Sequence, residues 1–119
     1  MMRWLSLGLG AGLLVTTVMA SAQPIGNVEA GREKSQACIA CHGATGAADN
    51  PAFPMLAGQH VDYLLYALEG YKSGERQNAI MNGQAAALSQ EDMRDLAAFY
   101  AAQDPALYTL ERRSARSER

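Results

Sequence analysis

The feature that most constrains this chain is a pair of cysteines, Cys38 and Cys41, followed directly by His42. They are the only cysteines among the 119 residues. A disulfide between them would close a very short loop and stabilise little, because the entropic benefit of a disulfide grows with loop length. A chain of this length buries only a modest core and often needs a disulfide, a metal or a cofactor. We therefore expect another group to be attached at this pair.

The Cys-x-x-Cys-His spacing is a haem attachment signature. The two thiols add to the two vinyl groups of the porphyrin as thioethers, and two intervening residues on a helical turn place both sulfurs on one side. The histidine that follows then lies under the iron and can ligate it. The motif predicts one covalently bound haem c per chain, attached through Cys38 and Cys41 and ligated by His42.

Three alternative interpretations of the motif stay open, and each has a weakness. A thioredoxin-like redox site normally accompanies a βαβ pattern, which the sequence does not show. A zinc site needs about four ligands. Beyond Cys38, Cys41 and His42 the chain offers only His60 and carboxylates. A simple disulfide gives His42 no role. The motif therefore favours haem attachment.

The N-terminus has the three parts of a secretory signal peptide. Arg3 precedes an apolar run from Leu5 to Ala20, and Ala20-Ser21-Ala22 places small residues at the positions that a signal peptidase reads. We predict a signal peptide over residues 1–22 and a periplasmic mature protein. A retained membrane anchor is the alternative, although the run is short for a full span. No other segment is long and apolar enough to cross a bilayer, so no stable membrane span is expected after the signal peptide is cleaved.

The chain carries 12 acidic and 10 basic side chains, but several of the basic ones gather at its C-terminus. Residues 111–119 contain arginines and no apolar residue larger than alanine, which predicts a basic, disordered tail. The folded domain, expected over residues 23–110, is therefore clearly acidic. This charge argues against nucleic acid as a partner.

Hydrophobic periodicity and capping residues predict an all-α domain without a β-strand. A first helix is expected over Val28–Ala40, with Asn27 as its N-cap. A second helix is expected over Gln59–Ser73, and Gly74 is placed to end it.

The second half of the domain has a less regular stretch, residues 75–88, followed by one more helix. This last helix is expected from Ser89, because Asp92 three residues on makes an acidic variant of the capping box. Pro105 lies just beyond its expected end.

The ordered set of residues resembles the class I cytochromes c, most closely the half-unit of cytochrome c4 and related single-haem c553-type carriers. The similarity covers nearly all of residues 29–103. The residues that carry it are Gly31, the Cys38-to-His42 motif, residues 50–59, Tyr63-Leu64, residues 74–76, residues 81–83, Leu88-Ser89, Asp92 and residues 96–100. The resemblance implies a small class I cytochrome c fold, with about four helices around one covalently bound haem.

The resemblance also implies roles for individual residues. In this family a methionine in the loop before the last helix ligates the iron opposite the histidine, and Met81 stands at that point. Met55 and Met93 are the competing candidates. Pro54 matches the proline whose carbonyl accepts the second ring N–H of the histidine ligand and so orients it.

Further residues are expected around the haem. Gly31 matches the small residue that lets the first helix cross the last, near Phe99 and Tyr100. His60 is expected at the surface or at a helix start. An apolar pocket is expected from Phe53, Leu56, Leu64, Leu68, Leu96 and Phe99. Tyrosines at helical spacing are ordinary core candidates that can also pack near the haem: Tyr63, Tyr66 and Tyr71.

Two filled axial positions leave no place for a substrate, so the expected function is electron transfer and not catalysis. The resemblance implies a soluble periplasmic carrier whose haem cycles between Fe(II) and Fe(III). Its partners are expected to be a donor and an acceptor protein, such as a quinol–cytochrome c reductase and a terminal oxidase or reductase. An electron-transfer subunit of a respiratory or dehydrogenase complex is one alternative. A haem peroxidase with a labile sixth ligand is another.

Overall fold

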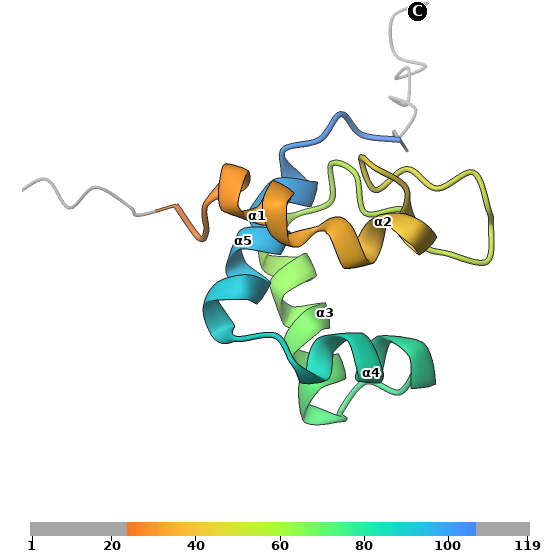
Figure 1. Ribbon diagram of the computed structural model, residues 1–119, viewed down its shortest axis with the longest axis vertical. Helices are drawn as coiled ribbons and strands as arrows, with labels where there is room; N and C mark the ends of the chain where they lie inside the picture. The colour runs from red at the N-terminus through yellow and green to blue at the C-terminus, as the bar shows by residue number, and fades with distance from the viewer. Residues whose placement is uncertain (1–23, 107–119) are drawn as a thin grey trace, which may run out of the picture.

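A computed structural model describes residues 24–106, which form five helices and no strand (Figure 1). The helices are α1 (Val28–Lys34), α2 (Gln36–His42), α3 (Val61–Ser73), α4 (Ala79–Ala86) and α5 (Gln90–Ala101). The predicted signal peptide and the predicted basic tail lie outside the described residues. The all-α prediction is confirmed, and the described residues form five helices where the resemblance implied about four. Within residues 24–106, every helix is too short or too polar to cross a membrane.

Helix α1 crosses α5 at close range, and Gly31 makes this approach possible. A Cβ atom at position 31 would overlap the carbonyl of Asp95 and would lie 2.7 Å from the Cβ of Phe99. A larger residue would hold the two helices apart. The expectation that a small residue stands at this crossing is confirmed.

The first helix is interrupted at Ser35, which corrects the expected single helix over residues 28–40. Helix α1 ends at Lys34, and α2 runs from Gln36 to His42. The Ser35 side chain is buried, and its hydroxyl donates to the carbonyl of Arg32 at 2.7 Å. A serine that bonds back to the preceding turn competes with the backbone ladder and bends a helix. The haem attachment motif therefore occupies a short helix of its own.

Capping residues account for three of the helix ends. The side chain of Asn27 accepts a hydrogen bond from a backbone N–H of the first turn of α1. Gly74 ends α3 with a φ of 83°, a left-handed conformation that glycine adopts without strain. Ser89 and Asp92 form the predicted capping box at the start of α5. All three ends agree with the sequence-based prediction.

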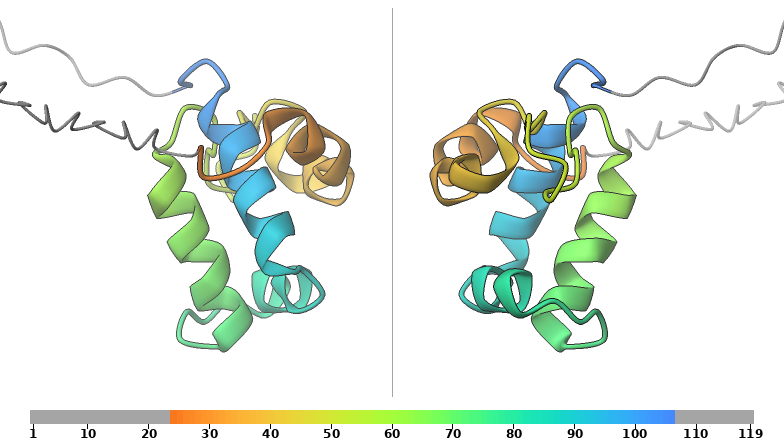
Figure 2. Two further views of the ribbon diagram at one scale, coloured as in Figure 1. Left: turned by 90° about the vertical axis from the view of Figure 1, so that its left-hand side faces the viewer. Right: turned by 90° about the vertical axis from the view of Figure 1, so that its right-hand side faces the viewer.

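Helix α3 begins at Val61, two residues later than expected, and the exposed His60 is its N-cap residue. The helix then runs beside α5, with α4 below both (Figure 2). The core lies around α5, which packs against both α1 and α3. Its buried members are Leu64, Leu96, Ala97, Phe99 and Tyr100.

Helix α4 occupies a stretch that was expected to be irregular, residues 75–88. Asn78 caps this helix, because its side chain accepts hydrogen bonds from two backbone N–H groups of the first turn. Gly83 within the helix lowers its intrinsic propensity, which is why periodicity alone did not indicate it. The consequence for the site is that Met81 lies in the first turn of a helix and not in a loop.

Candidate functional site

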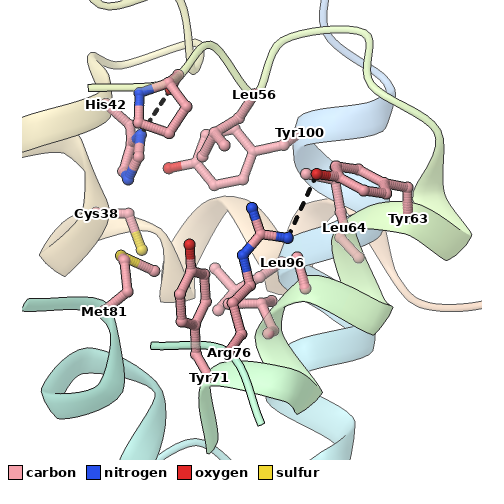
Figure 3. Close-up of a pocket in the computed structure, with 14 residues that line it drawn as sticks. Cys38, His42, Leu56, Tyr63, Leu64, Tyr71, Arg76, Met81, Leu96 and Tyr100 are labelled. Atoms are coloured by element: carbon pink, nitrogen blue, oxygen red, sulfur yellow. Dashed lines mark hydrogen bonds between the residues drawn. The ribbon is translucent and has the colours of Figure 1, made fainter. Parts of the chain in front are cut away.

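A crevice with an apolar lining opens among α2, residues 43–60, α3, α4 and α5 (Figure 3). It has two adjoining lobes that share Cys38, His42, Pro54, Tyr71 and Met81. The lobes hold empty volumes of about 700 and 760 Å³, space open to solvent included. The crevice therefore brings the attachment motif on α2 together with side chains from the rest of the described chain.

Helix α2 brings both thiols to this crevice. Cys38 lines both lobes and Cys41 lines the second, and both are free and partly buried. Residues three apart on a helix lie on the same face, so the two sulfurs can attach to one flat group. Burial raises the pKa of the Cys38 thiol above its usual value, whereas the thiols of redox-active Cys-x-x-Cys sites have lowered pKa values.

The rival interpretations of the motif find no support in the described part of the chain. Residues 24–106 contain no strand, so the βαβ pattern of a thioredoxin-like site is missing from them. Within the same residues no group of three or more His, Cys, Asp and Glu side chains is placed to hold a metal ion. His60, the extra histidine that a zinc site would need, is exposed at the start of α3.

His42 is the last residue of α2 and is only 5% exposed. Its Nδ1 lies 2.9 Å from the carbonyl oxygen of Pro54, and the ring of Phe53 packs edge-on at 6.2 Å between centroids. A carbonyl only accepts hydrogen bonds, so Nδ1 carries the proton and donates it. In the neutral imidazole the second ring nitrogen then carries the free lone pair, and it points into the crevice (Figure 3). This is the tautomer and orientation that a metal ligand needs.

Met81 lines both lobes of the crevice, and its sulfur points into the crevice in Figure 3. The competing methionines lie elsewhere. Met55 is 40% exposed, and Met93 is 3% exposed within the packed face of α5. Neither Met55 nor Met93 lines the two lobes. Of the three candidates, the fold thus brings only Met81 together with His42.

The apolar wall agrees with the expectation except at one residue. Phe53 lines the second lobe. The main lobe is lined by leucines from three segments: Leu56, Leu64, Leu68 and Leu96. Phe99 does not line the crevice, which corrects the prediction. It is 4% exposed and faces α1, where Gly31 and Arg32 contact it. On the same helix, Leu96 and Tyr100 face the crevice instead.

Two residues of the crevice wall, Tyr100 and Arg76, have no role in the site that the sequence alone assigns. Tyr100 lines the main lobe, its hydroxyl points into the crevice in Figure 3, and the buried oxygen has no hydrogen-bond partner among the described residues. Burial raises the pKa of Tyr100 above its usual range. Arg76 lines the main lobe together with Tyr63 and Tyr71, whereas Tyr66 is 65% exposed and does not. Only the fold could reveal these contacts.

These residues fit a covalently bound haem. Two thiols and an oriented imidazole from α2 and a thioether from α4 line one crevice with apolar walls. Soft sulfur and imidazole ligands suit haem iron. A buried hydroxyl without a partner costs free energy, so Tyr100 also indicates a crevice that is completed by a bound group.

Comparison with known proteins agrees with this assignment. Cytochrome c-554(548) of Halomonas halodenitrificans is 39% identical over 82 residues, which are 66% of this chain and 99% of that protein. Cytochrome c4 of Pseudomonas aeruginosa is 41% identical over 91 residues, 76% of this chain and 45% of that protein. The crystal structure of reduced cytochrome c4 from Pseudomonas stutzeri superposes with a TM-score of 0.64 at 39% identity. It covers 66% of this chain, which in turn spans 46% of that chain.

The chain therefore spans nearly all of one relative and about half the length of the cytochrome c4 proteins. The five helices of residues 24–106 and the similarity to cytochrome c4 give the chain the class I cytochrome c fold. The sequence model of the cytochrome c family matches residues 28–102. The chain thus belongs to the cytochrome c family and is an electron-transfer protein, not an enzyme, with covalently bound haem c.

Proposed function

We propose that this chain is a periplasmic carrier of single electrons, with one haem attached through Cys38 and Cys41 and ligated by His42 and Met81. The observation that carries the proposal is the meeting of these four side chains at one crevice. In Figure 3 the imidazole of His42 and the sulfur of Met81 point toward each other. These two side chains would hold the iron of a bound haem and would leave it no open position for a substrate.

The iron supplies the one-electron chemistry, Fe(II) to Fe(III), and the chain supplies its surroundings. The Pro54 carbonyl holds the Nδ1 proton of His42, which makes the imidazole a better ligand. The thioether of Met81 is neutral and soft, so it favours the ferrous state and raises the reduction potential. The leucines of the main lobe exclude water from the space between these ligands. With no open position for a substrate, the site can exchange electrons and little else.

Redox partners of a small carrier dock weakly through small interfaces. Acidic side chains outnumber basic ones within residues 24–106, so long-range attraction favours partners with a basic docking surface. A quinol–cytochrome c reductase as donor and a terminal oxidase or reductase as acceptor fit this role. The predicted N-terminal signal peptide and the relatedness to cytochrome c4 support the periplasm as its compartment.

The experiment starts with the holoprotein purified from the periplasmic fraction. A visible spectrum of the reduced protein and a pyridine haemochrome assay measure the type and number of haems, and we expect one haem c per chain. Met81→Ala then abolishes the weak near-infrared band from sulfur to ferric iron and lowers the reduction potential. The control is Met55→Ala, which removes an exposed thioether outside the crevice and leaves both unchanged. Survival of the band in Met81→Ala contradicts the axial assignment, and the absence of covalent haem contradicts the whole proposal.

A further inference from the structure

Helix α4, which carries Met81, has few apolar contacts that fix its position. Of its eight residues only Ala85 is buried, and Ile80 is 59% exposed. Gly83 lowers the intrinsic propensity of this short helix further. An element with so little buried apolar surface opens more easily than the core of a protein. The thioether of Met81 therefore needs another restraint to stay in the crevice.

The side chain of Asn82, the residue after Met81, supplies such a restraint. Its Nδ2 donates to the carbonyls of Tyr71 and Arg76, at 2.7 and 2.8 Å. Its Oδ1 accepts a hydrogen bond from the backbone N–H of Asn78 at 2.8 Å. One planar amide thus joins α3, the turn that follows α3 and the start of α4.

The partners of Asn82 determine which way its amide points. Carbonyl oxygens only accept hydrogen bonds and a backbone N–H only donates, so the oxygen and the nitrogen of the amide cannot be exchanged. Both N–H donors and the oxygen are therefore used. Tyr71 lies in the last turn of α3, whose carbonyls have no partner within the helix. Asn82 satisfies one of these carbonyls, which ties the end of α3 to α4.

A second asparagine, Asn78, holds the same turn of α4 from its N-terminal side. The Oδ1 of Asn78 accepts hydrogen bonds from the N–H groups of Ile80 and Met81, at 3.1 and 3.0 Å. Because Asn82 binds the N–H of Asn78, the cap and the helix are fixed to α3 together. Met81 lies between the two asparagines in the sequence, and its sulfur points into the crevice (Figure 3). The backbone on both sides of the thioether is thus held in place.

We propose that Asn82 is a positioning residue for Met81: it fixes α4 against α3 and thereby determines how firmly the thioether is held at the iron. The inference rests on the proposed function, because it needs Met81 as an iron ligand. Asn82 itself lines neither lobe of the crevice, so it acts through the helix and not by touching the bound group. Without its hydrogen bonds, conformations in which the sulfur has left the crevice become more populated.

The test compares the unmodified ferric holoprotein with three variants: Asn82→Ala, Asn82→Asp and the control Asn27→Ala. Asn82→Asp keeps the shape and the acceptor of the amide but loses both donors. Asn27→Ala makes the same substitution at the N-cap of α1, which destabilises the fold without touching α4 or the crevice. The control therefore separates an effect on Met81 from a general loss of stability.

Two measurements report on the bond between the sulfur and the iron. Added imidazole binds the ferric iron only where it displaces the thioether, so its apparent dissociation constant measures how firmly Met81 is held. The near-infrared band from sulfur to ferric iron measures the fraction of molecules that keep this ligand. In both Asn82 variants we expect imidazole to bind about 10 to 100 times more tightly, because two hydrogen bonds are lost. The band weakens, the haem content is unchanged, and Asn27→Ala binds imidazole as the unmodified protein does.

The inference is overturned if the imidazole affinity and the near-infrared band of Asn82→Ala match those of Asn27→Ala. A lower melting temperature with an unchanged imidazole affinity also overturns it, because Asn82 then only stabilises the fold. Asn82→Asp supplies the measurement if Asn82→Ala does not accumulate as holoprotein. An unmodified holoprotein that lacks the near-infrared band instead refutes Met81 as a ligand, and with it the proposed function, which separates the two failures.

Discussion

The Nζ of Lys34, at the end of α1, lies 2.6 Å from Oδ2 of Asp95 in the middle of α5. The Asp95 side chain is only 6% exposed. Its other oxygen accepts a hydrogen bond from the backbone N–H of Asn27 at 2.8 Å. One buried carboxylate thus holds both ends of α1 against α5, and Asp92 adds a second contact to Lys34 at 2.9 Å.

Replacing Asp95 with asparagine keeps the shape of the side chain and removes its charge. We expect the free energy of unfolding to fall by about 1.5 to 3 kcal/mol, the usual contribution of a hydrogen bond to a charged group. Urea unfolding of the holoprotein, followed by circular dichroism, measures the change. Asp104→Asn is the matched control, because Asp104 is exposed and we expect no loss there. Equal stability of the two variants contradicts the structural role of Asp95.

The same contacts predict how stability responds to acid. Lys34, and next the N–H of Asn27, lower the pKa of Asp95 in the folded state, while the unfolded chain has an aspartate pKa of about 3.9. The stabilisation is therefore present above about pH 5 and is lost as the pH falls through the depressed folded pKa. Unfolding free energies measured at a series of acidic pH values show this loss in the unmodified protein. The Asp95→Asn variant gives a flatter curve, and parallel curves for the two proteins would refute the linkage.

A methyl group at the crossing of α1 and α5 tests how tightly these helices pack. In Gly31→Ala the new Cβ overlaps the Asp95 carbonyl, so we expect a loss of about 1 to 3 kcal/mol from overpacking. Gly83→Ala is the control, since nothing lies within 4 Å of its added Cβ. The free energy of unfolding of Gly83→Ala rises by about 0.5 to 1 kcal/mol, because alanine has the higher helix propensity. In thermal unfolding, the melting temperature falls in Gly31→Ala and rises in Gly83→Ala. An unchanged melting temperature in Gly31→Ala would contradict the close approach of α1 to α5.

Removal of both thiols tests whether the attached group stabilises the fold. The double variant Cys38→Ala, Cys41→Ala cannot form thioethers, and its crevice keeps apolar walls without a bound group to cover them. We expect a haem-free chain with little protected structure, because small domains often depend on such a group. Amide hydrogen exchange and circular dichroism measure the remaining structure. A cooperative, well-protected apoprotein would show that the helices need no haem.

Local signals in the sequence predicted the helix ends well. The Asn27 cap, the Gly74 end and the Ser89 capping box each depend on residues within one turn, and all are present. The break at Ser35 was missed because a single serine is compatible with a continuous helix, and what decides the outcome is its burial against the rest of the fold. Helix α4 gives a weaker signal, because its start is marked only by Asn78 and because Gly83 lowers its helix propensity.

The candidate site was predictable where its residues are close in sequence. Cys38, Cys41 and His42 form one motif, and the resemblance to class I cytochromes c added Met81 and Pro54 from elsewhere in the chain. The contribution of Arg76 was not predictable, because it depends on a turn after α3 that brings the side chain back over the crevice. Phe99 was assigned to the wrong side of its helix, since a helix buried on two faces gives no sequence signal that separates them.

The partnership of α1 and α5 also bears on the order of events during synthesis. The two helices meet through residues 61 positions apart, Lys34 and Asp95. A chain emerges from its N-terminus first, so the first helix has no partner until almost the whole domain has been made. Cys38 and Cys41 are complete long before that moment. In a chain that emerges in this order, both thiols therefore stay exposed until α5 docks and closes the domain around them.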